Sequence, residues 1–184
     1  MKLSLLSILL GVGMSVPQVY ALAKPAQFTA AARKLPRNLP VGIALMLLGT
    51  AWFLWIVNQE PIADFSSFKP YMLTAFAAIG LATCVFVQDF LAARGLAVVL
   101  LLLGKLMVDT GRPHLGESPF VLVIQAWAYV LIVAGMWFTI TPWKLRDLIE
   151  FATATQNRIR VGSLVRLAFA AFVLILGLTA FRAM

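Results

Sequence analysis

The chain is short, apolar and basic, and these properties indicate whether it lies in water or in a membrane. It has 184 residues, of which 62% are hydrophobic and 12% charged, and its formal net charge is +8. A soluble domain carries about 25% charged residues, so this composition excludes a water-soluble globular protein and predicts one that lies in a bilayer.

The predicted elements are helices, because a membrane span needs about 20 mainly apolar residues. The apolar runs predict an all-α polytopic membrane protein, with six transmembrane helices arranged as three hairpins in a single domain over residues 1–184. The fourth helix contains Lys105 and the sixth contains Arg166, so each spans the bilayer if that cation is sheltered or reaches the surface. The expected helices are 3–22, 39–58, 70–88, 94–110, 119–140 and 162–181.

The first of these helices has a second interpretation. Lys2, the apolar stretch and the Ala21-Leu22-Ala23 triplet resemble a secretory signal with a small-residue cleavage site. A cleavage pattern of this kind is weak evidence by itself, so we expect a retained helix and keep cleavage as the alternative.

Basic residues gather on alternate connections between the expected helices. The first, third and fifth connections hold most of them, whereas the second has Lys69 and the fourth has Arg112. Short cytoplasmic loops are enriched in Lys and Arg. The pattern predicts a multi-pass protein of a bacterial-type inner (plasma) membrane with both termini outside.

Two of the basic connections have apolar residues at helical spacing. They predict short amphipathic helices over 25–35 and 142–155, lying in the cytoplasmic surface of the membrane. Pro25 and Pro142 are the expected first helical residues, and Thr141 is the expected N-cap.

The cations of these connections favour lipid as a partner. They are spread along a membrane surface, which suits anionic phospholipids far better than nucleic acid. The expected head-group contacts are Arg33, Lys34, Arg37, Lys144, Arg146, Arg158 and Arg160.

The three basic connections also share a plan, in which a descending helix leads through the connection to an ascending helix that contains glycine. This plan resembles the small two-helix bacterial membrane proteins of the YjeT type. The resemblance covers single hairpins and implies no activity. We therefore keep both a threefold repeat and a set of unrelated hairpins as interpretations.

The stretch from Lys105 to Pro113, KLMVDTGRP, resembles the first signature of the membrane phosphatidic-acid phosphatase superfamily, in which the Lys and Arg bind phosphate. The remaining signatures of that superfamily supply two catalytic histidines, one as nucleophile and one as acid. This chain has one histidine, His114, and no Pro-Ser-Gly-His, so we reject the phosphatase and predict that the protein is not an enzyme.

The low counts of histidine and cysteine exclude other chemistry. One His and one Cys cannot form a four-ligand zinc site, a bis-His haem site or an internal disulfide, and we expect no metal and no cofactor. Cys84, in the middle of the third helix, is expected to be an apolar packing residue rather than a reactive thiol.

A polar stripe remains on the fourth helix. Lys105, Asp109 and Arg112 stand at i, i+4 and i+7, and Gln125 on the next helix lies at a similar depth. These four residues could line an outward-facing pocket for an ion or an anionic group. The alternative, which we favour, is that Lys105 pairs with Asp109 and reaches the surface near a helix end.

Other positions favour contacts between helices. Arg166 could pair with Asp89 or Glu150 or reach lipid, and the alanines at 75, 78 and 82 suit close packing of helices. Because catalytic constellations are missing, we expect a non-catalytic accessory or scaffold subunit of a larger membrane assembly, whose partners are other membrane subunits or further copies of itself. A small transporter or channel with a pocket around Lys105 and Asp109 is the alternative.

Overall fold

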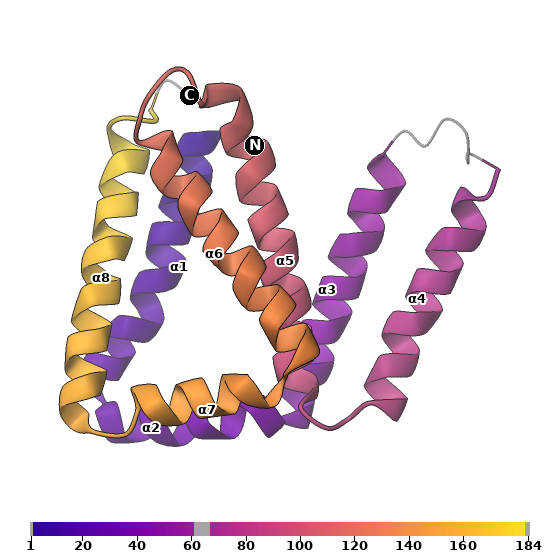
Figure 1. Cartoon of the computed structure of the whole chain (residues 1–184), viewed down its shortest axis with the longest axis horizontal. Helices are drawn as coiled ribbons and strands as arrows, with labels where there is room; N and C mark the ends of the chain where they lie inside the picture. Colours follow the sequence, from indigo (N-terminus) through magenta and orange to yellow (C-terminus); the bar gives the residue numbers. More distant parts are fainter. Residues whose placement is uncertain (1, 61–66, 183–184) are drawn as a thin grey trace. The chain divides into compact units, whose positions relative to one another are not determined.

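The computed structural model describes residues 2–60 and 67–182, and this part of the chain is helical without strands (Figure 1). Six of its helices are long and apolar enough to cross a membrane, as the sequence predicts. In chain order the elements are α1 (Leu3–Ala23), α2 (Pro25–Lys34), the 3-10 turn η1 (Leu35–Arg37), α3 (Leu39–Gln59), α4 (Lys69–Phe86), α5 (Leu91–Gly111), the 3-10 turn η3 (Arg112–His114), α6 (Val121–Ile140), α7 (Trp143–Ala152) and α8 (Gln156–Leu178).

The expected helix ranges agree closely with the structure except at the start of α8. This helix begins at Gln156 rather than at residue 162, because Thr155 has extended backbone and its hydroxyl oxygen accepts a hydrogen bond from the Arg158 amide. Such an N-cap satisfies one of the donors that a helix start leaves open. Arg158 and Arg160 therefore lie inside α8 and not on a connection.

Both short basic segments are helical. Pro25 begins α2 as predicted, and α7 occupies Trp143–Ala152 within the expected range of 142–155. The prediction that Thr141 caps α7 with its side chain was wrong: its hydroxyl donates to the carbonyl oxygen of Trp137, at 3.0 Å, at the end of α6. The location of α2 and α7 in the surface of the membrane stays a prediction.

The chain divides into two compact units, each built from several segments. Unit 1 comprises Met1–Arg33, Leu103–Ile132 and Arg146–Met184, and unit 2 comprises Lys34–Leu102 and Val133–Leu145. Helices α2, α5, α6 and α7 contribute residues to both units. The single domain and the three hairpins expected from the sequence stay predictions.

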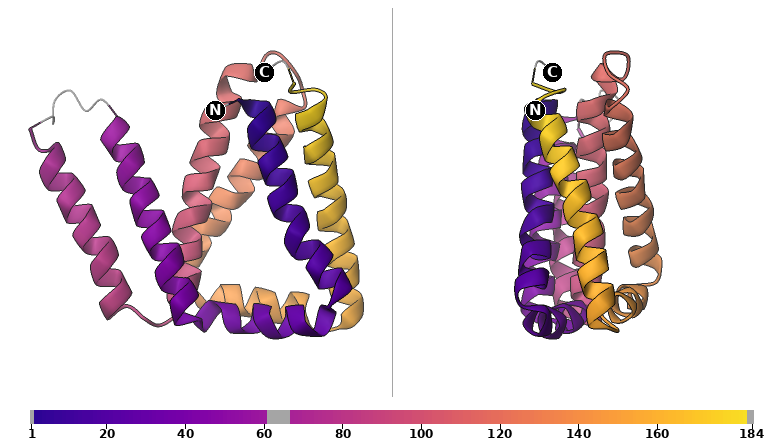
Figure 2. Two further views of the ribbon diagram at one scale, coloured as in Figure 1. Left: turned by 180° about the vertical axis from the view of Figure 1, so that it is seen from behind. Right: turned by 90° about the vertical axis from the view of Figure 1, so that its left-hand side faces the viewer.

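In unit 1, α1 and α8 lie side by side and run antiparallel (Figure 2). The absence of a side chain at Gly11 and Gly177 allows this close approach: a Cβ at Gly11 would lie 2.7 Å from the Cβ of Leu174, and one at Gly177 would lie 3.1 Å from the carbonyl oxygen of Ser4. Residue 11 thus meets residue 174 and residue 177 meets residue 4, which is the register of an antiparallel pair.

The apolar core of unit 1 joins this pair to α5 and α6. Trp127 and Phe169 stack at a tilt with ring centroids 5.0 Å apart. Close contacts between such side chains contribute dispersion attraction and fix their packing. The buried members of the core are Leu3, Leu6, Met107, Val121, Ile124, Ala128, Val173, Leu176 and Phe181.

In unit 2, α3 packs against α4 and against the first half of α5. Phe53 and Phe76 meet edge to face at 5.1 Å, and Gly80 lies against Thr50, so α3 and α4 run antiparallel. A Cβ at Gly95 of α5 would lie 2.8 Å from the amide nitrogen of Met46 on α3. A Cβ at Gly49 of α3 would lie 2.8 Å from the side chain of Val98 on α5. Both contacts join residues about 49 positions apart, so α3 and α5 run parallel.

Candidate functional site

The C-terminal end of α7, in unit 1, is held by two arginines from other elements. Arg33 of α2 donates from Nε to the hydroxyl oxygen of Thr153, at 3.0 Å, and from Nη2 to its carbonyl oxygen, at 2.9 Å. Arg158 of α8 donates to the carbonyl oxygen of Phe151 at 3.3 Å and lies 4.4 Å from the centroid of its ring. The last carbonyls of a helix lack partners within it and carry partial negative charge, so these two guanidinium groups cap α7.

A small cavity of about 70 Å³ lies beside this junction. Ser163 is 1% exposed, and Arg166 donates from Nε to the carbonyl oxygen of Gly162, at 3.0 Å. Arg166 therefore turns back to its own helix, and the pairing with Glu150, one of the alternatives considered from the sequence, is not formed. The cavity is lined by Phe28, Ala32, Ile149, Ala152, Thr153, Ile159, Ser163 and Arg166.

The remaining predicted head-group contacts fall into three groups. Arg146 pairs with Asp147 at 2.9 Å, and the hydrogen bond and charge of this carboxylate raise the pKa of the Arg146 guanidinium. Arg37 lies over the phenyl ring of Phe90 in unit 2, and Lys144 is exposed at the start of α7. Lys34 and Arg160 are exposed and have no hydrogen bond or ion pair with the residues that the structure describes.

The residues of the predicted polar pocket are partly brought together. Lys105 and Asp109 form an ion pair of 2.6 Å along α5, with 44% and 52% of their side chains exposed. Gln125 is buried and donates to the carbonyl oxygen of Val108, at 3.2 Å, which engages its amide with the α5 backbone. Arg112 is exposed in η3.

Sequence reasoning missed three features of these regions. Thr153 accepts a hydrogen bond from Arg33 and is 6% exposed. The sequence prediction places Thr153 inside the expected 142–155 helix and gives it no such role. His114 and Glu117 pair at 2.8 Å on the connection before α6, at an i, i+3 spacing that could have indicated the contact. Phe90 has a backbone φ of 53°, for which the sequence offers no signal.

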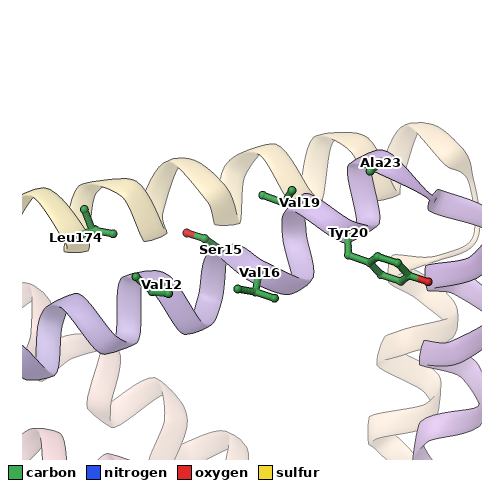
Figure 3. Close-up of a pocket in the computed structure, with 7 residues that line it drawn as sticks. All are labelled: Val12, Ser15, Val16, Val19, Tyr20, Ala23 and Leu174. Atoms are coloured by element: carbon green, nitrogen blue, oxygen red, sulfur yellow. The ribbon is translucent and has the colours of Figure 1, made fainter.

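An apolar groove of about 470 Å³ runs along α1 in unit 1 (Figure 3). Val12, Val16 and Val19 line it from α1, and Leu174 lines it from α8. The hydroxyl of Ser15 donates to the carbonyl oxygen of Gly11, at 2.7 Å, and so presents no free donor. In a bilayer, a surface of this kind suits hydrocarbon chains.

Comparison with known proteins gives no relative: no family model, no curated protein and no solved structure matches the chain.

Proposed function

We propose that the protein is a non-catalytic accessory or scaffold subunit of a larger membrane assembly. It lies in a bacterial-type inner membrane as a multi-pass protein with both termini outside, and α2 and α7 lie in the cytoplasmic surface on anionic phospholipid. The six long apolar helices support the membrane setting. The surface of α4 supports the role as a subunit.

Helix α4 uses one of its faces within unit 2. Phe76 meets Phe53 at 5.1 Å, and Gly80 lies against Thr50 of α3. The opposite face is exposed and has small residues at helical spacing, namely Ala75, Ala78 and Ala82. Two exposed aromatic side chains stand at its ends, Tyr71 with 74% exposure and Phe86 with 82%.

This face favours a protein partner over lipid. Interfaces between membrane helices are enriched in small residues, because small side chains let two backbones approach closely. Lipid gains nothing from such a stripe, since acyl chains pack equally well on large aliphatic side chains. The partner we expect is a transmembrane helix of another subunit or of a second copy of this chain.

The test is recovery of the complex from native membranes in mild detergent, with its members identified by mass spectrometry. Replacing Ala78 and Ala82 by Leu should remove the co-purifying subunit, or convert a dimer to a monomer, because the larger side chains keep the helices apart. The matched control is Ala168→Leu, the same change at an exposed position of α8. Recovery of the parent as a bare monomer, or equal retention by both variants, would overturn the proposal.

The proposed orientation has its own test. In a Cys84→Ala background, a cysteine in place of Ala30 should react with impermeant reagents from the cytoplasmic side, and one in place of Ser118 from the outside. The opposite labelling would reject the orientation and leave the subunit proposal untouched.

The alternative function, a small transporter or channel, rests on the stripe from Lys105 to Arg112. The ammonium of Lys105 has its carboxylate partner one turn away on the same helix, and both side chains are about half exposed. A pair of this kind supports a charged helix end more than a pocket, and for that reason we prefer the subunit role.

A further inference from the structure

The short connection between α4 and α5, in unit 2, contains an unusual backbone conformation. Phe90 has a φ of 53°, in the left-handed region that residues with a Cβ rarely adopt, and it is the one non-glycine residue with positive φ among the described residues. Its side chain is 7% exposed. Strained residues of this kind persist where the surroundings hold them, and they gather at sites with a function.

Arg37 is fixed next to this phenyl ring. Its guanidinium carbon lies 4.9 Å from the ring centroid, within the range of a cation–π contact. The neighbours of Arg37 in the chain are anchored: Pro36 is buried, and the side chain of Asn38 caps α3 by accepting from the Val41 amide at 3.2 Å. The backbone of Arg37 is therefore held on both sides, and its exposed side chain extends over the ring of Phe90.

The close approach of α3 and α5 brings the two segments together. A Cβ at Gly42 would lie 2.7 Å from the amide nitrogen of Ala92 and 3.0 Å from the carbonyl carbon of Leu91. Glycine is thus needed where the first turn of α3 meets the first turn of α5. This contact sets the distance between Arg37 and the 88–90 turn.

An open recess of about 400 Å³ lies between these segments, lined by Arg37, Leu39, Gln88, Asp89 and Phe90. Arg37 offers guanidinium donors on one side. Asp89 offers an exposed carboxylate that has no hydrogen bond or ion pair with the residues the structure describes. The side-chain nitrogen Nε2 of Gln88 donates to the carbonyl oxygen of Val85 at 3.3 Å, so the side-chain oxygen of Gln88 remains as a further acceptor.

We propose that this recess binds the phosphoethanolamine head group of a membrane lipid, with the phosphate on Arg37 and the ammonium on Asp89 and Gln88. A guanidinium matches the oxygens of a phosphate, and an ammonium needs acceptors for its three donors. The recess lies where α4 ends and where α3 and α5 begin, which is the depth at which lipid head groups stand. The proposal does not depend on the subunit role proposed above.

The donors and acceptors of the recess discriminate between head groups. Phosphatidylglycerol has the phosphate and no cation, so its glycerol hydroxyls can donate to the Asp89 carboxylate but do not neutralise the charge of that carboxylate beside the phosphate. Phosphatidylcholine has a cation without N–H donors, so it cannot hydrogen-bond to Asp89 or Gln88. A site that provides hydrogen-bond partners rejects ligands that leave those partners unpaired.

The test is native mass spectrometry of the full chain in detergent with equal amounts of phosphatidylethanolamine, phosphatidylglycerol and phosphatidylcholine. We expect the parent to retain phosphatidylethanolamine roughly three- to tenfold over the other two, the effect of about one hydrogen bond. Asp89→Asn should bring the ratio of phosphatidylethanolamine to phosphatidylglycerol close to one. Soluble phosphoethanolamine in excess should displace the lipid, whereas glycerol phosphate should not.

The control variant is Glu117→Gln, because it removes one exposed carboxylate, as Asp89→Asn does, at a residue that does not line the recess. It should keep the parent's lipid ratio. Asp89 is exposed, so Asp89→Asn is expected to fold as the parent does, which thermal melts of both proteins check. The proposal is overturned if the parent holds phosphatidylglycerol as well as phosphatidylethanolamine, or if Asp89→Asn leaves the ratio unchanged.

Discussion

Arg33 and Lys105 stand near the ends of helices, and from the sequence both can be interpreted as cations that reach the membrane surface. In the structure their partners differ. Arg33 binds the hydroxyl and carbonyl oxygens of Thr153, which lies 120 positions away, directly after the end of α7. Lys105 binds Asp109, which lies one turn away on its own helix.

This difference in partners indicates which surface charges contribute to the stability of the fold. An i, i+4 ion pair on an exposed helix face contributes about 0.3–0.5 kcal/mol, because both side chains remain well solvated when the pair breaks. A charge-assisted hydrogen bond between elements also satisfies a helix end and holds two segments together. We therefore expect the arginines at α7 to matter for stability, and the pair on α5 to matter little.

The largest expected effect is that of Arg33→Gln. This change removes two hydrogen bonds from Thr153 and should lower the free energy of unfolding by about 1–2 kcal/mol. Thermal unfolding in detergent measures the effect, with Lys34→Gln as the neighbouring control. Equal melting temperatures for the two variants would remove the distinction between Arg33 and an ordinary surface cation.

A smaller effect is expected for Arg158→Gln. Its bond to the carbonyl oxygen of Phe151 is longer, at 3.3 Å, and Arg158 stacks on the ring of that residue. The loss should be about 0.5–1 kcal/mol. Arg160→Gln, two residues along the same helix, should unfold at the parent's temperature. A larger loss for Arg160 than for Arg158 would contradict the capping role.

The Lys105–Asp109 pair should show a smaller effect still. Lys105→Met and Asp109→Asn are each expected to cost about 0.3–0.5 kcal/mol, and high salt should weaken the contribution further. A buried pair predicts a different pattern, in which each single change costs about 3–5 kcal/mol and the double change costs less. Melts of the two single variants and the double variant distinguish these cases.

The smallest stability effect is expected where lipid is the partner. Replacing Lys34 and Arg160 together by Gln should leave the melting temperature unchanged and reduce the retention of phosphatidylglycerol or cardiolipin in native mass spectrometry. Arg33→Gln should reduce that retention less, since its guanidinium is engaged by Thr153. Equal retention by the parent and the Lys34–Arg160 variant would mean that these charges serve orientation alone.

The six long helices could be predicted from the sequence, because the length of an apolar run is a local property that the bilayer thickness selects. Helix ends were harder where a single cap decides them. Thr155 caps the start of α8 by accepting one hydrogen bond from the Arg158 amide. Nothing in the apolar pattern of the sequence indicates that position.

The contacts of the candidate site could not be predicted, because they join elements far apart in the chain. The Arg33–Thr153 bonds require α2 and α7 to meet, which hydropathy does not specify. The alanines of α4 were expected to suit close packing of helices. In the structure Ala75, Ala78 and Ala82 are exposed, because the face with Phe76 and Gly80 is the one that meets α3. Composition identifies a face suited to packing and does not say which partner occupies it.

The central claim is that Arg33 stabilises the protein through Thr153, and a double-mutant cycle in thermal unfolding tests it most directly. The cycle uses Arg33→Gln, Thr153→Val and both together, since valine keeps the shape of threonine and removes the hydroxyl acceptor. We predict a coupling energy of about 0.5–1.5 kcal/mol between the two changes. Effects that add within about 0.3 kcal/mol would show that the two side chains act independently and would contradict the account.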